Sequence, residues 1–237
     1  MKTAIMQPYF MPYIGYFQLI YNTDRFILLD DVQFARHGWI ERNRILRQGG
    51  DWLYIKVPVK RKNGRETKIR EVEIDNALPW KEKILAQLQG YKRKAPFYYD
   101  TVRVIQDVFS NEYGSITCLN RDALAGICRY LGIDREIKIF SDMGLEIAEP
   151  EASDEWALNI CRALSDVSEY WNPQGGAVFF DRGKYERSGI PIRFIEPVIE
   201  PYFQGSSNFQ GSLSIIDVMM FNPVEAIIEA MKTFRSF

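Results

Sequence analysis

The first twenty residues of the chain constrain its fold more than any other stretch. Thr3–Met6 is a short apolar run that stops before Pro8, and it predicts a buried strand whose end is set by proline. Pro8 and Pro12 then frame a loop. Ile14–Ile20 follows with apolar residues that can line the inner side of a helix, and Gly15 allows a close backbone approach there. A strand, a loop and a helix in this order place ligands at the carboxyl end of a parallel strand.

The rest of the pattern predicts an α/β fold with a mostly parallel central sheet and flanking helices, a β-hairpin insertion and a helical segment. The hairpin is indicated by the Asn-Gly turn within Arg61–Arg65. Val32–Ile45 reads as a loop or a broken helix, and Tyr170–Phe180 as a tight loop leading into an apolar piece. The predicted strands are Phe26–Leu29, Asp51–Val59, Lys68–Ile74, Ile137–Phe140 and Ile190–Ile195; the predicted helices are Trp80–Leu88, Tyr98–Phe109, Ile116–Leu131, Asp154–Leu164, Lys184–Ser188, Ser214–Met220 and Val224–Phe234. We expect a single domain over residues 1–237, in which the helical segment near residues 80–131 could form a subdomain.

Composition limits the partners and the compartment. The net charge is −1 at pH 7, so the bulk charge favours neither nucleic acid nor an anionic membrane as a partner. No apolar run approaches the roughly 18 residues that a membrane-spanning helix needs, and no secretory signal opens the chain. We therefore expect a soluble, cytoplasmic protein that does not insert into membranes.

The cysteines do not indicate a metal site. Cys118, Cys128 and Cys161 are dispersed, lack metal-ligand spacing, and are accompanied by a single histidine. Buried, reduced thiols are the expected state, and a nucleophilic thiol is the alternative. The chain also lacks a G-x-S-x-G elbow, a P-loop and a G-x-G-x-x-G motif. We expect no metal and no tightly bound cofactor.

The only histidine lies in the stretch where polar and aromatic residues are densest. His37 is the candidate general base at neutral pH, and Asp31 is the candidate carboxylate that would orient its imidazole if the loop folds back. A surface histidine without a catalytic role is the alternative. The two residues form the predicted catalytic pair.

Basic groups follow in the run Arg42-Asn43-Arg44. Guanidinium forks suit phosphate or carboxylate oxygens, and the amide suits a sugar hydroxyl or a base edge. The alternative is a pair of salt bridges to Asp30-Asp31 or Asp51. A second basic run, Lys92-Arg93-Lys94, either holds a phosphate or is a solvated helix end. The predicted substrate-binding residues are Gln7, Tyr9, Tyr13, Gln33, Trp39, Arg42, Asn43 and Arg44, in which the tyrosines could form a stacking wall for a base or sugar.

Six motifs carry a likeness to a known family. They are IMQPYFMPYIGYFQLI at Ile5–Ile20, DDVQF at Asp30–Phe34, GWIERNRI at Gly38–Ile45, the Gln174-Gly175-Gly176 loop through Phe180-Asp181, SGIPIRF at Ser188–Phe194 and LSIIDVMM at Leu213–Met220. With these motifs the chain resembles the WbqC-like protein family nearly from end to end. The resemblance implies a bacterial protein of surface-polysaccharide (O-antigen) gene clusters. It does not imply a settled reaction.

A second likeness concerns the N-terminal loop alone. Gln7–Tyr16 looks like the strand–loop–helix of nucleotidylyltransferases, in which a GxFxPxHxGH pattern binds the nucleoside triphosphate. Pro12 and Gly15 fit that pattern, but Tyr13 and Tyr16 stand where it has histidines. Tyrosine cannot supply the cation that stabilises the transferring phosphoryl group. The likeness implies a nucleotide-binding cleft rather than the standard chemistry.

We therefore expect a transferase that acts on a nucleotide-linked amino sugar, by acyl or aminoacyl transfer to the sugar amine. His37 would take the amine proton, and Arg42 and Arg44 would hold the phosphates. The donor would be an acyl or aminoacyl thioester on a carrier protein or on coenzyme A. Three alternatives stay open: a non-catalytic sugar-nucleotide-binding protein, an assembly protein of the same pathway, and a degenerate nucleotidylyltransferase. A homo-oligomer also stays open, and no nucleic-acid partner is expected.

Overall fold

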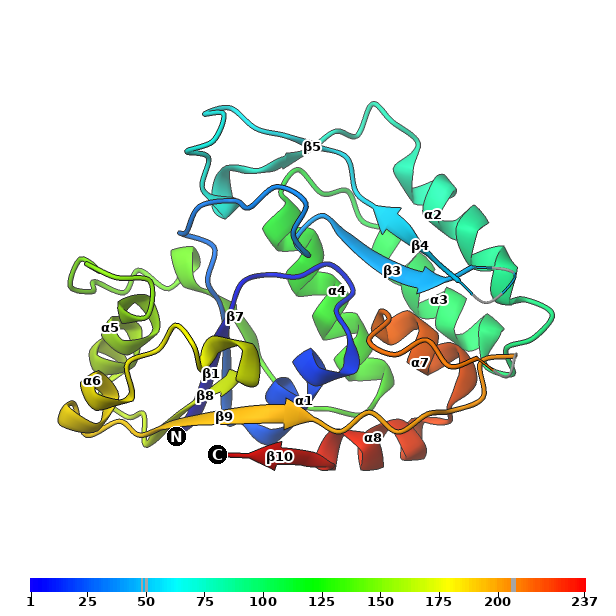
Figure 1. The fold of residues 1–237 in the computed structure, drawn as a ribbon. Helices are drawn as coiled ribbons and strands as arrows, with labels where there is room; N and C mark the ends of the chain where they lie inside the picture. The colour runs from blue at the N-terminus through cyan, green and yellow to red at the C-terminus, as the bar shows by residue number, and fades with distance from the viewer. Residues whose placement is uncertain (48, 50, 206–207) are drawn as a thin grey trace.

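A six-stranded sheet forms the centre of the computed structural model, which describes residues 1–47, 49, 51–205 and 208–237 (Figure 1). The strand order is β10-β9-β8-β1-β2-β7, and all neighbours run parallel except β10, which is antiparallel to β9. The predicted α/β fold with a mostly parallel sheet is confirmed. The strands of this sheet are β1 (Lys2–Met6), β2 (Arg25–Leu28), β7 (Ile137–Ile139), β8 (Glu169–Pro173), β9 (Ile192–Pro197) and β10 (Phe234–Ser236).

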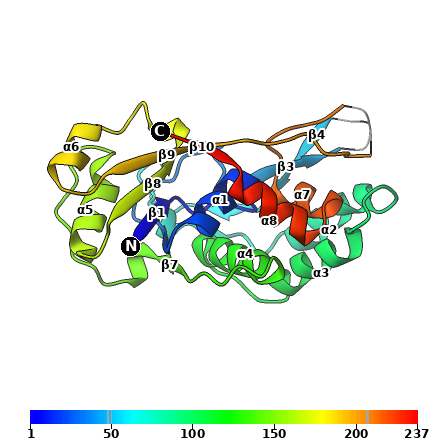
Figure 2. The same cartoon turned by 90° about the horizontal axis from the view of Figure 1, so that it is seen from below.

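Helices cover both faces of the sheet because successive strand residues point to opposite sides. One face of the sheet packs against α1, α4, α7 and α8, and its core includes Ala4, Phe26 and Leu28. The other face packs against α5 and α6, and its core includes Ile5 and Ile27. Figure 2 shows α8 beside α1 near the middle of the molecule, with α5 and α6 at one end of it. The α-helices are α1 (Ile14–Asn22), α2 (Trp80–Leu88), α3 (Tyr98–Phe109), α4 (Ile116–Tyr130), α5 (Glu155–Leu164), α6 (Arg182–Arg187), α7 (Ile215–Phe221) and α8 (Val224–Lys232); short 3₁₀ helices are η1 (Ile69–Glu71), η2 (Gln89–Tyr91), η3 (Phe140–Asp142) and η4 (Gln174–Gly176).

The predicted helical segment is present as α2, α3 and α4. The bounds of α3 agree with the prediction, and α4 ends just before Gly132, whose φ of 70° suits glycine. Side chains from all three helices belong to the same core cluster as β1 and α1. The division into domains stays a prediction.

The insertion contains two hairpins where one was expected. β3 (Arg42–Leu46) pairs antiparallel with β4 (Trp52–Lys56), so the expected loop or broken helix at Val32–Ile45 was wrong in its last part. The expected strand at Asp51–Val59 is divided, since β4 ends before Pro58 and β5 (Val59–Lys60) continues separately. The predicted hairpin around Arg61–Arg65 is confirmed as a short one, in which β5 pairs with β6 (Glu73–Ile74).

The interpretation of Tyr170–Phe180 as a loop was also wrong in its first part, because β8 occupies Glu169–Pro173 next to the central β1. Asn172 fits this strand since its side-chain amide donates to the Tyr170 hydroxyl at 2.6 Å. Pro173 is the last strand residue, where its missing N–H removes little from the ladder.

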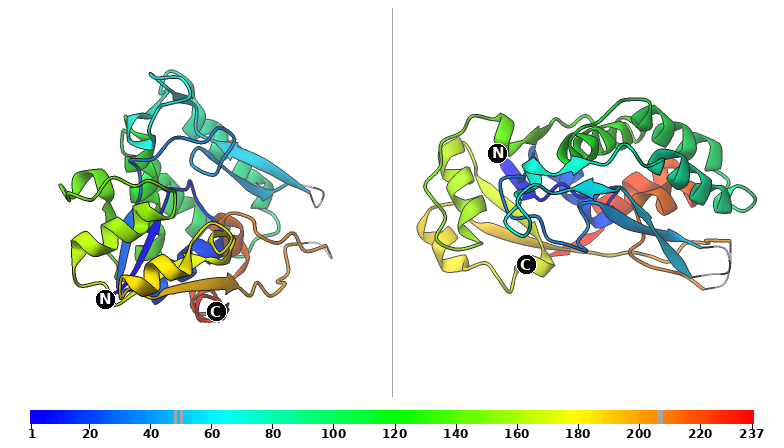
Figure 3. Two further views of the ribbon diagram at one scale, coloured as in Figure 1. Left: turned by 60° about the vertical axis from the view of Figure 1, so that its left-hand side comes forward. Right: turned by 90° about the horizontal axis from the view of Figure 1, so that it is seen from above.

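Between β9 and α7, the described residues 198–205 and 208–214 form a segment without helix or strand, and a buried carboxylate holds it in place. Asp217 accepts hydrogen bonds from the hydroxyls of Tyr91 (2.8 Å) and Tyr202 (2.6 Å) and from Nε2 of Gln204 (2.7 Å). Burial raises the pKa of Asp217, although the three donors stabilise its charged form. The network joins η2, this segment and α7, and it fixes the segment beside the β3–β4 ribbon, as Figure 3 shows.

Candidate functional site

The order in which strands are added to the sheet reverses at β1, which creates the natural ligand-binding edge of such a sheet. β2 pairs with one side of β1 and β8 with the other, so the connections leaving β1 and β8 go in opposite directions. Ligands of open α/β sheets bind outside the carboxyl ends of the strands at such a switch point. The segments that leave this edge are the loop 7–13 after β1 and η4 after β8.

The loop 7–13 lies against the segment that carries Trp39 and β3. The backbone N–H of Phe10 donates to the carbonyl of Trp39 at 2.8 Å, and Nδ2 of Asn43 donates to the carbonyls of Phe10 and Met11, both at 3.0 Å. Met11 has a φ of 43°, a conformation that costs a non-glycine residue energy and needs such support. The loop 7–13 is therefore in direct contact with the segment that carries Trp39 and β3.

Side chains from α4 and from the residue before α7 also hold the loop 7–13. Nδ2 of Asn120 on α4 donates to the carbonyls of Pro8 (2.8 Å) and Ile40 (2.9 Å), and so joins the loop to the Trp39 segment. The hydroxyl of Ser214, before α7, donates to the carbonyl of Met11 at 2.6 Å. These side chains are buried, so their hydrogen bonds keep the loop in one conformation.

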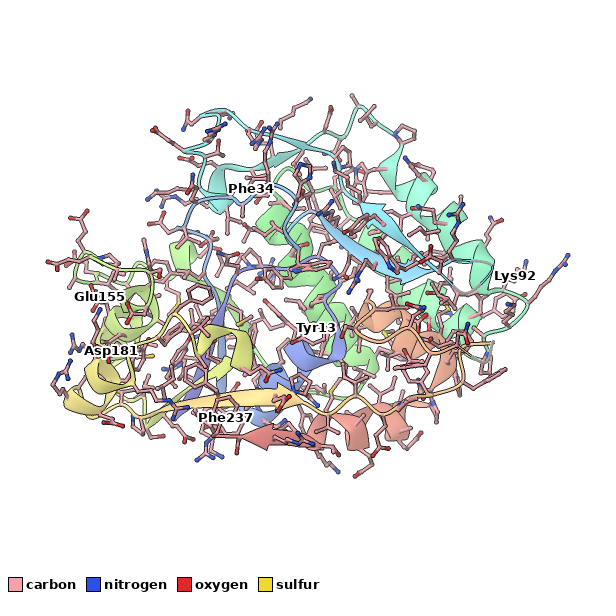
Figure 4. The ribbon with its side chains drawn as sticks, viewed as in Figure 1. Tyr13, Phe34, Lys92, Glu155, Asp181 and Phe237 are labelled. Carbon is pink, nitrogen blue, oxygen red and sulfur yellow. The ribbon has the colours of Figure 1, made fainter. Side chains whose placement is uncertain are left out.

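Tyr9 and Tyr13 are half-buried on this loop, whereas Tyr16 is fully buried and donates its hydroxyl to the Gln7 carbonyl at 2.8 Å. Burial raises the pKa of all three phenols, most for Tyr16, so they stay neutral. Figure 4 shows Tyr13 near the centre of the molecule at the start of α1. The expected close approach at Gly15 is present: a Cβ there would lie 2.5 Å from both the Tyr13 ring and Pro197.

Cations and aromatic rings share one face of the β3–β4 ribbon. Arg42 lies 4.3 Å from the centre of the Tyr54 ring, and Arg44 lies 5.4 Å from that of Trp39 and 5.2 Å from that of Trp52. These five residues, Trp39, Arg42, Arg44, Trp52 and Tyr54, are called the ribbon face below. Stacking on rings leaves the in-plane N–H groups of a guanidinium free to bind an anion.

Neither arginine of the ribbon face forms an ion pair within the described part of the chain, so the salt-bridge alternative does not account for them. Arg42 donates to the carbonyls of His37 and, at 3.3 Å, Gly38. Arg44 makes one long hydrogen bond, 3.4 Å, to the carbonyl of Ser212, and its buried Nε has no partner among the described residues. Arg44 therefore keeps most of its hydrogen-bonding capacity for a ligand.

Trp52 and Tyr54 were missed as site residues. The signal that could have found them is the alternation in the strand predicted at Asp51–Val59, which puts both rings on the same side. Without the pairing of β3 with β4, nothing in the sequence relates that side to Arg42 and Arg44.

The predicted catalytic pair is not in contact. His37 is exposed on a turn with a φ of 61°, beside the ribbon face through its hydrogen bond with Arg42. Asp31 instead binds Nζ of Lys68 at 3.0 Å and Nε of Arg70 at 2.9 Å, both from the insertion. The orienting role given to Asp31 is therefore absent from this arrangement, and the catalytic role of His37 stays a prediction.

Asp30, the acidic residue next to Asp31, has the more unusual environment of the two. Asp30 is buried at the end of β2 and accepts hydrogen bonds from the backbone N–H (3.1 Å) and hydroxyl (2.7 Å) of Ser141. Burial raises its pKa, while the two donors oppose that shift. The side chain joins the ends of β2 and β7 and is closed to substrate.

Two predicted substrate-binding amides form hydrogen bonds to other parts of the protein. Asn43 is buried, with its amide N–H groups on the loop 7–13 and its oxygen on the backbone N–H of Arg44 at 2.8 Å. Nε2 of Gln33 donates to the carbonyl of Arg65 at 2.6 Å, which ties the segment after β2 to the insertion. Both amides position other parts of the site. Gln7 is half-buried at the carboxyl end of β1, where its contact with a ligand stays a prediction.

The two buried thiols are poor nucleophiles. Cys128 and Cys161 are buried, and burial raises the pKa of each to about 12; Cys118 is partly buried. Among the described residues, no group of three or more histidine, cysteine, aspartate or glutamate side chains could hold a metal ion. In the same part of the chain, no helix is both long enough and apolar enough to span a membrane.

Comparison with known proteins agrees with the motifs that run along the chain. The protein is 30% identical over 224 residues to "Uncharacterized protein Rv1507c" of Mycobacterium tuberculosis, an alignment that covers 93% of each chain. No solved structure matches it. The model of the WbqC-like protein family matches residues 7–229, a range that includes the loop 7–13, the ribbon face and the Asp217 network. The chain therefore belongs to the WbqC-like protein family.

Proposed function

We propose that this protein is a transferase of bacterial surface-polysaccharide (O-antigen) assembly that acylates or aminoacylates the amine of a nucleotide-linked amino sugar. The single observation that carries the proposal is the contact between the switch-point loop 7–13 and the ribbon face, through the Phe10–Trp39 hydrogen bond. Membership of the WbqC-like family supports the proposal, since the polysaccharide setting is what the resemblance to that family implies.

Arg44 is the phosphate-binding residue in this proposal. Its guanidinium lies 5.4 Å from the centre of the Trp39 ring and 5.2 Å from that of Trp52, and most of its N–H groups have no protein acceptor among the described residues. A diphosphate would accept hydrogen bonds from this fork, and Trp39, which is 38% exposed, offers a face on which a base or sugar ring can stack. Tyr9 and Tyr13 on the loop 7–13 offer neutral hydroxyls to the sugar.

His37 is the proposed base for the amine. The sugar amine attacks the thioester carbonyl, the C–N bond forms, the C–S bond breaks, and the amine proton passes through the imidazole to the departing thiolate. Because Asp31 is bound to Lys68 and Arg70, His37 performs this step without a carboxylate partner. We expect a modest contribution from the base, on the order of 10²-fold.

The test separates binding from turnover. Wild-type protein is titrated calorimetrically with a panel of nucleotide-linked amino sugars, and product formation with acyl thioesters is followed by mass spectrometry. We expect Arg44→Gln to weaken sugar-nucleotide binding about 10-fold or more, since a charge-assisted hydrogen bond is lost. Arg103→Gln, which removes an exposed charge on α3, is the matched control. Equal affinities of the two variants would remove the proposed phosphate site.

His37→Ala should keep the binding and lose most of the turnover. Undiminished turnover in this variant would remove histidine from the reaction.

One observation favours a second candidate, a non-catalytic sugar-nucleotide-binding protein of the same pathway. His37 is exposed and Asp31 is occupied by two cations, so no oriented base is present at the ribbon face. Binding of a sugar nucleotide without turnover, across a panel of acyl and aminoacyl thioesters, would establish this candidate in place of the transferase.

A further inference from the structure

A hollow whose charged lining residues, among those that the structure describes, are all basic lies at the end of the β3–β4 ribbon. It has a volume of about 830 Å³ and is formed by the ends of β3 and β4 together with the second half of α2 and the residues that follow it. Its charged lining residues are Arg47, Lys92 and Arg93, and none of the described residues that line it is acidic. In Figure 4, Lys92 lies at the end of the molecule opposite to Glu155 and Asp181.

These three cations have no acidic partner among the residues that the structure describes. Within the described ranges, Arg47, Lys92 and Arg93 form no ion pair, and Lys92 only approaches the Tyr99 ring, 5.9 Å from its centre. The whole chain has a net charge of −1, so this local excess of positive charge does not follow from composition. Like charges around one hollow repel each other, and a bound anion would remove that repulsion.

Hydrogen bonds hold two of the residues that line the hollow. The backbone N–H of Leu46 donates to the hydroxyl of Tyr91 at 2.6 Å, and that hydroxyl donates in turn to the buried Asp217. Nε2 of Gln87 donates to the carbonyl of Tyr54 at 3.0 Å and so joins α2 to β4. The cations therefore stand around a fixed surface, and binding would require little ordering of the backbone.

The uncharged lining residues suit an organic phosphate more than a bare ion. Leu46, Leu53 and Ala86 provide apolar surface, and Gln89 provides an amide beside the cations. The volume also falls in the range of roughly 300–1,000 Å³ that is typical of small-molecule sites.

We propose that this hollow binds the phosphate groups of a coenzyme A thioester, the acyl donor of the reaction. This inference rests on the proposed function, since it names the donor for the same transfer. β3 connects the two sites: Arg42 belongs to the ribbon face and Leu46 to the hollow, about 13 Å apart at the usual rise per strand residue. An extended pantetheine arm spans that distance, so the thioester would reach the amine while the phosphates stay on Arg47, Lys92 and Arg93.

The test is calorimetric titration of the full-length protein with coenzyme A at low ionic strength. The double variant Arg47→Gln/Arg93→Gln should bind coenzyme A at least about 10-fold more weakly than the wild type. Pantetheine, which has no phosphate, should bind more weakly than coenzyme A, and added salt should weaken coenzyme A binding. Lys83→Gln, which removes an exposed charge from α2 outside the hollow, is the matched control and should leave the affinity unchanged.

Failure of this inference can be told apart from failure of the proposed function. All of the substituted side chains are exposed, so the variants should fold, which a thermal unfolding curve checks. No binding of coenzyme A to the wild type at millimolar concentration, or equal affinity in the double variant, overturns the inference even if sugar nucleotides bind at Arg44. Binding of a carrier protein but not of free coenzyme A overturns it as well. Coenzyme A binding that depends on Arg47 and Arg93 supports the hollow even if the Arg44→Gln test fails.

Discussion

Gly15→Ala should destabilise the protein, against the usual effect of this substitution in a helix. Alanine has a higher helix propensity than glycine by about 1 kcal/mol, so the exchange normally stabilises an α-helix. At residue 15 the new methyl group would lie 2.5 Å from Cγ of Pro197 and 2.5–2.6 Å from two atoms of the Tyr13 ring, where ordinary contacts begin near 3.4 Å. Neighbouring groups must therefore move by nearly 1 Å.

Overpacking costs about 1–3 kcal/mol, and three contacts at 2.5–2.6 Å put this site in the upper part of that range, above the propensity gain. We expect the free energy of unfolding to fall by about 1–2 kcal/mol in urea titrations followed by circular dichroism. Because the Tyr13 ring is the softer neighbour, it should move before Pro197 does, and sugar-nucleotide binding should weaken as well.

Gly126→Ala is the matched control for this prediction. It lies within α4, and its new methyl group would meet a single atom, Cγ2 of Val108, at 3.1 Å. That contact needs a shift of only a few tenths of an ångström, so the propensity term should dominate and the variant should be up to about 1 kcal/mol more stable. If the two alanine variants change the stability equally, the close packing of α1 against Tyr13 and Pro197 is not what the structure indicates.

Three further predictions concern buried groups. Asn120→Ala leaves the Pro8 and Ile40 carbonyls without their buried donor and should lower the free energy of unfolding by about 2–4 kcal/mol; a loss below 0.5 kcal/mol (roughly the scatter of surface substitutions) would contradict the proposed link. Burial raises the pKa of Asp217 above its usual 3.8, so the folded protein binds the carboxyl proton more tightly than the unfolded chain does. The stability that this proton contributes is present below a pH of about 3.8 and is lost as the pH rises from there through the folded pKa. The stability of wild type relative to Asp217→Asn should therefore fall as pH rises in that window, and a rise would show that the hydrogen bonds from Tyr91, Tyr202 and Gln204 outweigh burial. Among the thiols, Cys118 should react with a disulfide reagent at neutral pH well before Cys128 and Cys161, and faster modification of either buried thiol in the native protein would contradict their raised pKa.

The sequence by itself determined most of the local structure. The apolar spacing in Tyr98–Phe109 and Ile116–Tyr130 repeats with the helical period, which depends only on residues three and four positions apart. Pro8 and Pro12 each fix only their own φ angle, and the structure has a strand before Pro8 and a helix after Pro12. These features needed no partner from elsewhere in the chain, so pattern alone was enough for them and for the α/β class.

Only the tertiary structure decided which strands pair and which distant side chains come into contact. Glu169–Pro173 contains turn-forming residues, yet it is a strand because β1 and β9 supply hydrogen bonds on both sides, and a ladder of this kind is invisible to local pattern. Arg42 and Arg44 face Trp52 and Tyr54 only because β3 pairs with β4 in one register. For the same reason Asp31 binds Lys68 and Arg70, more than 30 residues away, rather than the nearby His37. Charged side chains pair with whatever the fold brings within a few ångströms, and neighbours in the sequence have no advantage once the chain turns away.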